Sequence, residues 1–288
     1  MNSKQLTLLV FLFSLCSKPA FSQWTKEKGK GYYKLSAWYL ESDQHYTDTG
    51  DTDPNITRGQ FNINFYGEYG LTDKLDIVAY IPFFSRVYQN DVISGTSGGT
   101  IGVGEDLNSI GDIDLGVSYG FINTGKFALS GTLKFGLPTG NDSGGSDGSY
   151  QTGDGEFNQT LLINAGAPFK LGNTSLYSKA YLGYNNRTQD FSDEFRSGFE
   201  IGANFFNKKL WLIGRADIVK SLKNGSLNAQ NSQGSIFANN IEYTSLGGEI
   251  AYYFTKKWGA SLNYTGAING RIIYAAPSIS FGVFLDIK

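Results

Sequence analysis

The chain has 288 residues and is rich in glycine (37), tyrosine (18) and phenylalanine (21) but poor in proline (6). This composition favours a β-rich protein with many turns over a helical or disordered one. The 24 Lys and Arg residues and 26 Asp and Glu residues give a net charge of −2. That balance argues against a nucleic-acid partner, because nucleic-acid-binding proteins carry a basic stripe.

The N-terminal segment has the three parts of a secretory signal. Lys4 precedes an apolar run over 6–15, and a small-residue cleavage pattern follows at 20–22. We therefore predict a signal peptide over 1–22 and a single domain over 23–288. The apolar run is too short to span a membrane as a helix, and no later run reaches 18 apolar residues.

Short segments that alternate apolar and polar residues recur along the chain. The clearest example places Phe61, Ile63 and Phe65 on one face of a strand and Asn62 and Asn64 on the other. The apolar face would be buried in a soluble sandwich or turned to lipid in a membrane barrel. Twelve strands are predicted, at 31–40, 60–70, 75–84, 112–122, 127–137, 157–169, 174–186, 195–206, 210–221, 241–254, 258–266 and 272–285.

The connections between these strands alternate in length. Short links are predicted at 71–74, 123–126, 170–173, 207–209 and 255–257, and long loops at 41–59, 85–111, 138–156, 187–194 and 222–240. A last short link, 267–271, contains Asn269-Gly270, which is a strong hairpin signal. Short periplasmic turns and long external loops are typical of outer-membrane barrels, whereas a Greek-key sandwich has no reason to keep this rhythm.

Aromatic residues near the strand ends predict girdles at the two membrane interfaces. The alternative is that they are core aromatics of a soluble β protein. The residues concerned are Trp38, Tyr39, Tyr69, Tyr119, Tyr184, Trp211, Tyr252, Tyr253, Trp258 and Tyr274. Pro82 and Pro277 fall inside predicted strands, and we expect a bulge or bend at each because proline cannot donate to the ladder.

Several glycine-rich segments carry a resemblance to a known family. They read GDIDLGVSYGF at 111–121, LKFGLPTG at 133–140 and TGDGEFN at 152–158, with GKGYYKL at 29–35 and PSISFGVF at 277–284. The chain resembles a family of outer-membrane transporters named for the meta-pathway of phenol degradation. The resemblance implies an outer-membrane β-barrel distantly similar to fatty-acid and aromatic-hydrocarbon porins. It carries over no substrate. The chain departs from those porins because no plug domain fits before the first strand and its last residue is not aromatic.

If the apolar face meets lipid, the opposite face lines a lumen with charges of both signs. They could form ion pairs that plug a narrow barrel, or line a wet pore and set its selectivity. About twelve strands fall between the filled and the open-channel barrel sizes, so both states stay open. The lumen candidates are Lys34, Glu68, Asp76, Asp112, Asp114, Lys134, Lys179, Arg187, Arg196, Glu200, Arg215, Asp217 and Glu249.

Other chemistry has weaker support in the sequence. Cys16, the only cysteine, suggests a lipid anchor, but Leu15 is larger than a lipobox accepts. The only histidine, His45, lies in a predicted loop, where a triad histidine is not expected. Gly102 and Gly104 precede no helix, so no dinucleotide cofactor is expected. Acidic loops could ligate calcium without matching any full motif, and their candidate residues are Asp48, Asp51, Asp53, Asp142 and Asp147.

We therefore predict an all-β fold, a single up-and-down antiparallel transmembrane barrel of about twelve strands in the outer membrane. Its predicted function is passive uptake of small molecules, apolar or aromatic ones among them, through a lumen gated by the loops 85–111 and 138–156. The predicted partners are outer-membrane lipid and a small-molecule solute. The alternatives are a plugged structural or adhesive barrel whose long loops bind a partner, an enzyme that uses His45, and a soluble secreted sandwich. The oligomeric state stays open.

Overall fold

The computed structural model describes residues 25–228 and 235–288. The predicted signal peptide at 1–22 and Cys16 lie outside these residues. Within the described ranges, no helix is long and apolar enough to cross a membrane.

The described residues form twelve long strands and four short ones. The long strands are β1 (Gly31–Tyr46), β2 (Thr52–Gly70), β3 (Leu75–Gln89), β7 (Ile113–Asn123), β8 (Ala128–Leu137), β9 (Asn158–Leu171), β10 (Thr174–Asn186), β11 (Glu194–Phe205), β12 (Leu210–Ser221), β13 (Glu242–Tyr253), β14 (Trp258–Arg271) and β16 (Ser278–Ile287). The short strands are β4 (Val92–Ile93), β5 (Thr100–Gly102), β6 (Glu105–Ser109) and β15 (Ile273–Tyr274).

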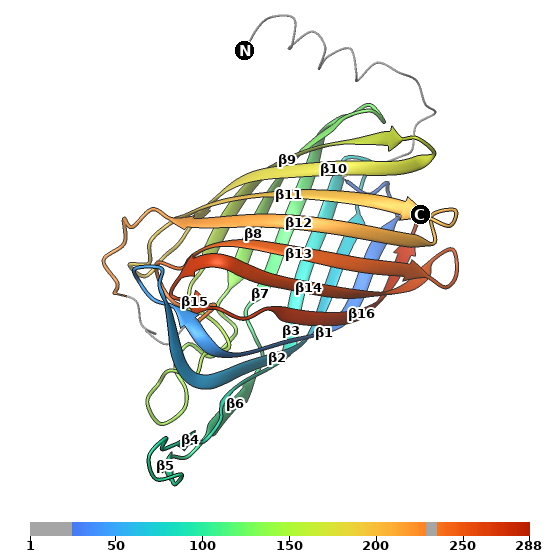
Figure 1. Ribbon diagram of the computed structural model, residues 1–288. Helices are drawn as coiled ribbons and strands as arrows, with labels where there is room; N and C mark the ends of the chain where they lie inside the picture. Colours follow the sequence, from blue (N-terminus) through green and yellow to red (C-terminus); the bar gives the residue numbers. More distant parts are fainter. Residues whose placement is uncertain (1–24, 229–234) are drawn as a thin grey trace, which may run out of the picture.

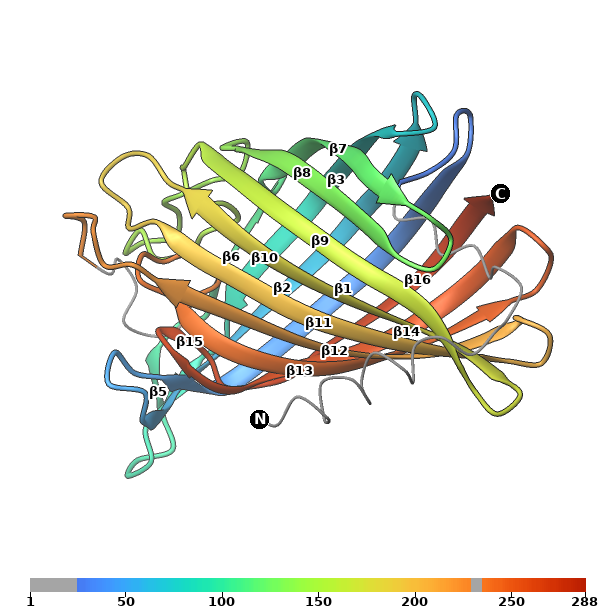
Figure 2. The same cartoon turned by 90° about the horizontal axis from the view of Figure 1, so that it is seen from above.

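The long strands close into one antiparallel barrel (Figures 1 and 2). Each strand pairs with the next long strand along the chain, and β1 closes the ring because it pairs with both β2 and β16. Short turns gather at the end near the C-terminus, and the long loops gather at the opposite end (Figure 1). The predicted barrel of about twelve strands is confirmed. By the usual arrangement, the long loops face the outside of the cell.

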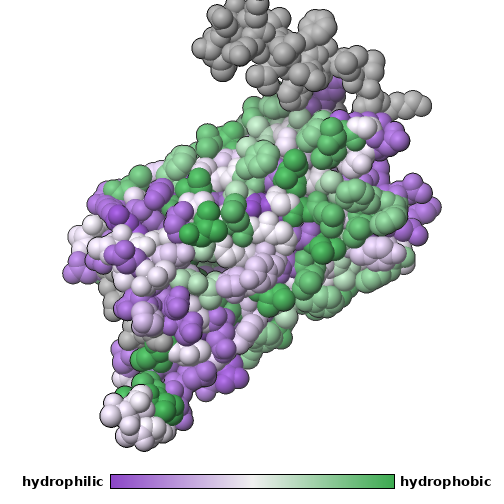
Figure 3. Space-filling view, in the orientation of Figure 1, coloured by the Kyte–Doolittle hydropathy of each residue, from purple (hydrophilic) through white to green (hydrophobic). Residues whose placement is uncertain are grey.

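The alternation of side chains sorts the wall into an apolar outer face and a polar inner face. Leu35 and Phe281 on the outer face are 53% and 55% exposed, whereas Gln60 and Asn64 on the inner face are 2% and 5% exposed. Figure 3 shows apolar side chains over the strands and hydrophilic ones gathered toward the ends. An apolar band that is exposed in an isolated barrel is the surface that lipid covers, so the barrel belongs in the outer membrane.

Several strands run beyond their predicted ends. β1 and β2 continue through most of the predicted loop 41–59 and meet in a tight turn, where the Thr47 amide donates to the Asp51 carbonyl at 2.8 Å. β3 likewise continues to Gln89 and pairs with β6 inside the predicted loop 85–111. These extensions lie beyond the apolar band on the extracellular side. Their outward side chains are not apolar there, so the alternation that predicts a strand is lost.

The predicted last hairpin was wrong. Residues 267–271 belong to β14, where Asn269 and Gly270 pair with β13, and the connection lies at 272–277 instead. Ile272 has a left-handed φ of 57°, which ends the strand, and Pro277 has no amide to donate, so β16 begins only at Ser278.

The two prolines therefore have different outcomes. At Pro82 the β2–β3 register shifts as predicted, which is a bulge. Pro277 instead precedes β16, so the bulge or bend predicted within a strand there is wrong.

The girdle prediction is correct for about half of its residues. Tyr39, Tyr69, Tyr119, Tyr184, Tyr252 and Trp258 lie on the outer face and are 38–50% exposed. Trp38, Trp211, Tyr253 and Tyr274 were wrongly predicted to face lipid. Neighbours along a strand point to opposite faces, so only one member of each of the pairs Trp38-Tyr39 and Tyr252-Tyr253 can face outward.

Candidate functional site

The strands bring the thirteen predicted lumen residues to the inner wall or to its extracellular rim. Lys34 shares a row with Tyr66 and Phe284 across β1, β2 and β16, and Glu200 shares one with Lys179 and Arg215. Paired residues in neighbouring strands face the same side of a sheet, so each such row lines the lumen.

Four of these residues form a continuous ionic chain at mid-height, here called the mid-barrel chain: Lys34, Glu249, Arg215 and Glu200. Lys34 Nζ lies 3.0 Å from Glu249, and Arg215 bonds Glu249 at 2.6 Å and Glu200 at 2.5 Å. The Tyr177 hydroxyl donates to Glu200 at 2.7 Å. Each charge therefore has a partner, which a charge in a narrow barrel requires.

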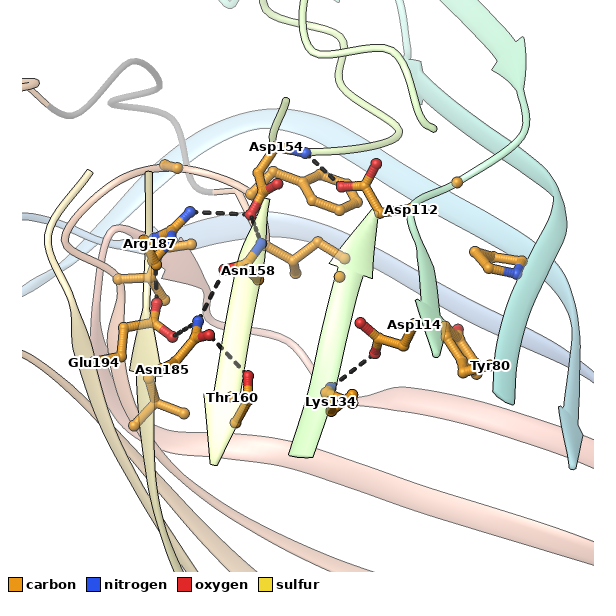
Figure 4. Close-up of a pocket in the computed structure, with 18 of the residues that line it drawn as sticks. Tyr80, Asp112, Asp114, Lys134, Asp154, Asn158, Thr160, Asn185, Arg187 and Glu194 are labelled. Carbon is orange, nitrogen blue, oxygen red and sulfur yellow. Dashed lines mark hydrogen bonds and ion pairs between the residues drawn. The ribbon is translucent and has the colours of Figure 1, made fainter. Parts of the chain in front are cut away.

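A second cluster, the mouth network, lies at the extracellular end (Figure 4) and consists of Asp154, Asn158, Thr160, Asn185, Arg187, Glu194 and Arg196. Arg187 bonds Asp154 at 3.0 Å and Glu194 at 3.2 Å, and only 3% of its side chain is exposed. Arg196 pairs with Glu194 at 2.5 Å. The network links the rims of β9, β10 and β11 to the loop 138–157 between β8 and β9.

The mouth network borders a cavity of about 270 Å³. One wall is polar and includes Asp112, Asp114 and Lys134, of which the last two pair at 2.8 Å. The opposite wall is apolar and comes from the loop between β12 and β13, with Ile236, Phe237, Ala238 and Ile241. The volume holds several waters or one small solute.

The loop 138–157 reaches over the mouth to β2 and to the loop between β12 and β13. Tyr150 is 3% exposed and packs 5.2 Å from the guanidinium of Arg58 on β2, which also donates to Ser149 at 2.8 Å. Gln151 accepts a hydrogen bond from Ser235 of the β12–β13 loop at 3.3 Å. The loop 138–157 thus borders the cavity and is held by contacts to β2 and to the β12–β13 loop.

One carboxylate holds both ends of this loop. Asp112, just before β7, accepts the amides of Gly140 at 2.8 Å and of Asp154 at 2.7 Å. Burial raises the pKa of Asp112 to about 6, against the two amides, which favour the charged form, and Asp154 adds to the rise by charge repulsion and a side-chain hydrogen bond. Asp112 therefore positions the loop over the cavity.

The other lumen candidates have local partners. Glu68 accepts from Tyr66 and pairs with Lys26 at 3.5 Å, and the backbone amide of Lys26 donates to Asp76 at 2.6 Å. Asp217 accepts from Tyr181 at 2.7 Å. The segment before β1 thus contacts the inner wall at the periplasmic end.

His45 was wrongly predicted to lie in a loop. It lies in β1 opposite Asp53 and Tyr274 and is 5% exposed. Within the described ranges its Nδ1 has no hydrogen-bond partner.

Asp48, Asp51, Asp142 and Asp147 lie in turns or loops at the extracellular end, and Asp53 lies in β2 opposite His45. Asp51 accepts a hydrogen bond from Thr49 at 3.0 Å, and Asp147 accepts the Ser149 amide at 2.9 Å. Residues 25–228 and 235–288 contain no group of three or more His, Cys, Asp or Glu residues arranged to hold a metal ion. Asp48, Asp53 and Asp142 therefore join no such group either.

The sequence did not place Asp154, Glu194, Asn158 and Asn185 among the lumen residues. Glu194 has the same parity as Arg196 and Glu200, so extending the predicted strand by one residue would have found it. Asp154 lies in a loop, where no periodicity marks which side chains point inward. The hydroxyls of Tyr177 and Tyr181 were missed because tyrosine was read as an interface residue.

Neither a protein-family model nor a curated protein matches the chain. Solved structures do match. An outer-membrane channel from Pseudomonas putida F1 is 15% identical, covers 94% of this chain and 99% of that chain, and has a TM-score of 0.59. The NanC porin is 7% identical, with 89% and 99% covered and a TM-score of 0.50. At such identities the likeness establishes the fold, a closed barrel of the outer-membrane type.

Proposed function

We propose that the chain is a passive outer-membrane channel for small polar solutes, with a preference for cations. The observation that supports it is the inner wall, which carries hydrogen-bonding and ionised side chains from the mouth cavity to the periplasmic end. Acidic side chains outnumber basic ones there, and a surplus of one sign sets the preferred ion. The acids are Glu68, Asp76, Asp112, Asp114, Asp154, Glu194, Glu200, Asp217, Glu249 and Asp286, and the bases are Lys26, Lys34, Arg58, Lys134, Lys179, Arg187, Arg196 and Arg215.

Recording current across a planar bilayer tests this proposal. Under a salt gradient we expect discrete steps and a reversal potential of cation-selective sign. Glu249→Gln should lower that selectivity, because it removes a negative charge between Lys34 and Arg215. Glu41→Gln is the matched control, since Glu41 is exposed and accepts from Tyr88 outside the lumen.

A silent bilayer with a folded, heat-modifiable band on a gel would contradict the channel. It would favour the plugged structural or adhesive barrel, whose long loops bind a partner.

A solute with an apolar or aromatic body is the second candidate. The observation in its favour is the apolar cavity wall formed by Ile236, Phe237 and Ala238, opposite the charged wall. Liposome swelling separates the two, because small sugars and amino acids should enter faster than neutral aromatics if the first proposal holds. Kinship with the meta-pathway family, which the glycine-rich segments suggest, would favour the second.

A further inference from the structure

Three basic side chains gather around one carboxylate at the extracellular end of β12, β13 and β14. Lys220 lies near the end of β12, Lys223 follows in the β12–β13 loop, and Arg271 ends β14. Their nitrogens lie 3.0, 3.9 and 4.0 Å from the carboxylate of Glu242. Three cations and one anion leave this group, here called the basic cluster, with a surplus of two positive charges.

The alternation of side chains places the basic cluster on the outer face of the barrel. Lys220 has the parity of Ile218, and Glu242 has the parity of Leu246, which are 37% and 50% exposed on that face. Arg271 is paired with Glu242 and therefore faces the same side. The three cations cover Glu242 and are themselves 39–54% exposed. They are thus open to a group that approaches from the membrane side.

The positive surplus is local, because the whole chain carries a net charge of −2. Arg86, which is exposed on the outer face of β3, has its own carboxylate partner in Asp106 at 3.2 Å. Asp48 and Asp51 lie in the turn beside the end of β14. In the described part of the chain, neither of them forms an ion pair with the basic cluster.

Toward the membrane centre, the same strands leave a hollow in the apolar band. Gly214 of β12 and Gly248 of β13 are paired and both lie on the outer face. A methyl group added at Gly214 would come no closer than 3.7 Å to another atom, and one at Gly248 no closer than 3.8 Å. Apolar side chains from the strands around this bare pair enclose a hollow of about 540 Å³, and they include Ile201, Leu212 and Leu262. Paired glycines in a strand often mark a place where a ligand approaches the backbone closely.

The basic cluster and the hollow are separated by about the thickness of one lipid leaflet. Gly214 lies six residues before Lys220 on β12, which is roughly 20 Å at about 3.4 Å per residue. A strand tilt of about 40° reduces this to a depth of roughly 15 Å, half of the roughly 30 Å hydrocarbon core. A phosphate held at the basic cluster therefore leaves its acyl chains at the depth of the hollow.

We propose that the basic cluster and the hollow together bind one phosphorylated lipid of the outer leaflet. Its phosphate pairs with Lys220, Lys223 and Arg271, and an acyl chain fills the hollow over Gly214 and Gly248. A phosphate monoester carries up to about two negative charges, which match the surplus of the basic cluster. The hollow is continuous with the apolar band that lipid covers, so a lipid satisfies both parts of the site. This binding goes beyond the proposed channel function and does not depend on it.

Native mass spectrometry of the refolded barrel in detergent tests the proposal. The probes are phosphatidic acid and phosphatidylcholine with the same acyl chains. We expect one phosphatidic acid to be retained under conditions in which phosphatidylcholine is lost. The double variant Lys220→Gln, Lys223→Gln should weaken this retention about twenty-five-fold, because each basic residue near a membrane surface contributes about fivefold to anionic lipid binding.

The matched control is the double variant Lys256→Gln, Lys257→Gln. Both lysines are exposed in the short turn between β13 and β14, at the periplasmic end. The control removes the same charge from the chain and should keep the retained phosphatidic acid. Equal losses in the two double variants would overturn the site, because they would show attraction to positive charge in general.

Gly248→Leu tests the hollow without changing any charge, and it serves also if the lysine variant does not fold. The leucine side chain would occupy the hollow, so long-chain phosphatidic acid should bind about threefold more weakly through lost dispersion contacts. Short-chain phosphatidic acid, which does not reach the hollow, should bind as before. An unchanged affinity for the long-chain lipid would overturn the proposed acyl-chain position.

Inorganic phosphate separates a lipid site from a simple anion site. If it displaces phosphatidic acid at equal concentration, the basic cluster binds phosphate alone and the lipid proposal is wrong. Equal retention of phosphatidylcholine would also overturn it. None of these measurements requires conductance, so failure of the lipid site and failure of the channel are distinguishable.

Discussion

The mid-barrel chain and the mouth network use the same chemistry but are held in different ways. Lys34, Arg215 and Glu249 all lie on barrel strands, so the hydrogen-bonded ladder fixes their spacing. In the mouth network, Arg187 pairs with Asp154, which lies in a loop. A charge on a strand cannot move away when its partner is lost, whereas a charge on a loop can turn to water. Ion pairs of the same kind therefore stabilise the rigid barrel wall in the mid-barrel chain and hold a movable loop in the mouth network.

The largest loss of stability is expected where a charge on a strand loses its partner and cannot move to water. Arg215→Ala leaves Glu200 and Glu249 facing each other, with side chains only 21% and 10% exposed. We expect a loss of about 3 kcal/mol, the lower end for a broken buried pair, since Lys34 still compensates Glu249. Urea unfolding in detergent, followed by gel mobility, measures this loss.

Lys220→Ala is the control for that measurement. Lys220 pairs with Glu242 at 3.0 Å, but its side chain is 54% exposed. The expected loss is below about 1 kcal/mol. Equal losses in Arg215→Ala and Lys220→Ala would remove the distinction between a lumen pair and a rim pair.

A smaller loss is expected for Arg187→Ala, although Arg187 is the more buried arginine. Glu194 keeps Arg196 at 2.5 Å, and Asp154 can leave with its loop. We expect about 1.5 kcal/mol of lost stability, together with faster proteolytic cleavage within 138–157. A loss as large as that of Arg215→Ala, with the loop still protected, would mean that Asp154 is as rigid as a strand residue.

The contrast between strand and loop residues also explains which parts of the site could be predicted from the sequence. A period of two identifies which strand residues face inward, so Lys34, Glu200 and Arg215 could be assigned without a structure. That period cannot say which of them meet, because the ion pair of Lys34 and Glu249 crosses two intervening strands, β16 and β14. The period also fails for tyrosine, which can lie at the membrane interface or donate a hydrogen bond inside the lumen. Tyr253 was therefore predicted to face lipid, although it faces inward.

Loops follow no such period. Asp112 could be placed near the mouth, but its two amide partners, Gly140 and Asp154, depend on the path of the loop 138–157. Strand ends outside the membrane were also missed, because their side chains alternate without a membrane face. The sequence therefore predicts the wall of the barrel but not the contacts that the loops make with distant parts of the chain.

A small loss of stability, but a marked change in the position of the loop 138–157, is expected for Gly153→Ala. The added methyl group would lie 2.1 Å from Asp112 Oδ1, so the carboxylate must rotate away and give up its amide donors. No charge changes, which separates the position of Asp112 from its ionisation. We expect about 1 kcal/mol of lost stability and a higher mean conductance. Gly95→Ala is the control, because its methyl group would meet nothing within 4 Å. If the two variants conduct alike, the contacts of Asp112 do not hold the loop, and the closure must come from Tyr150 and Arg58 instead.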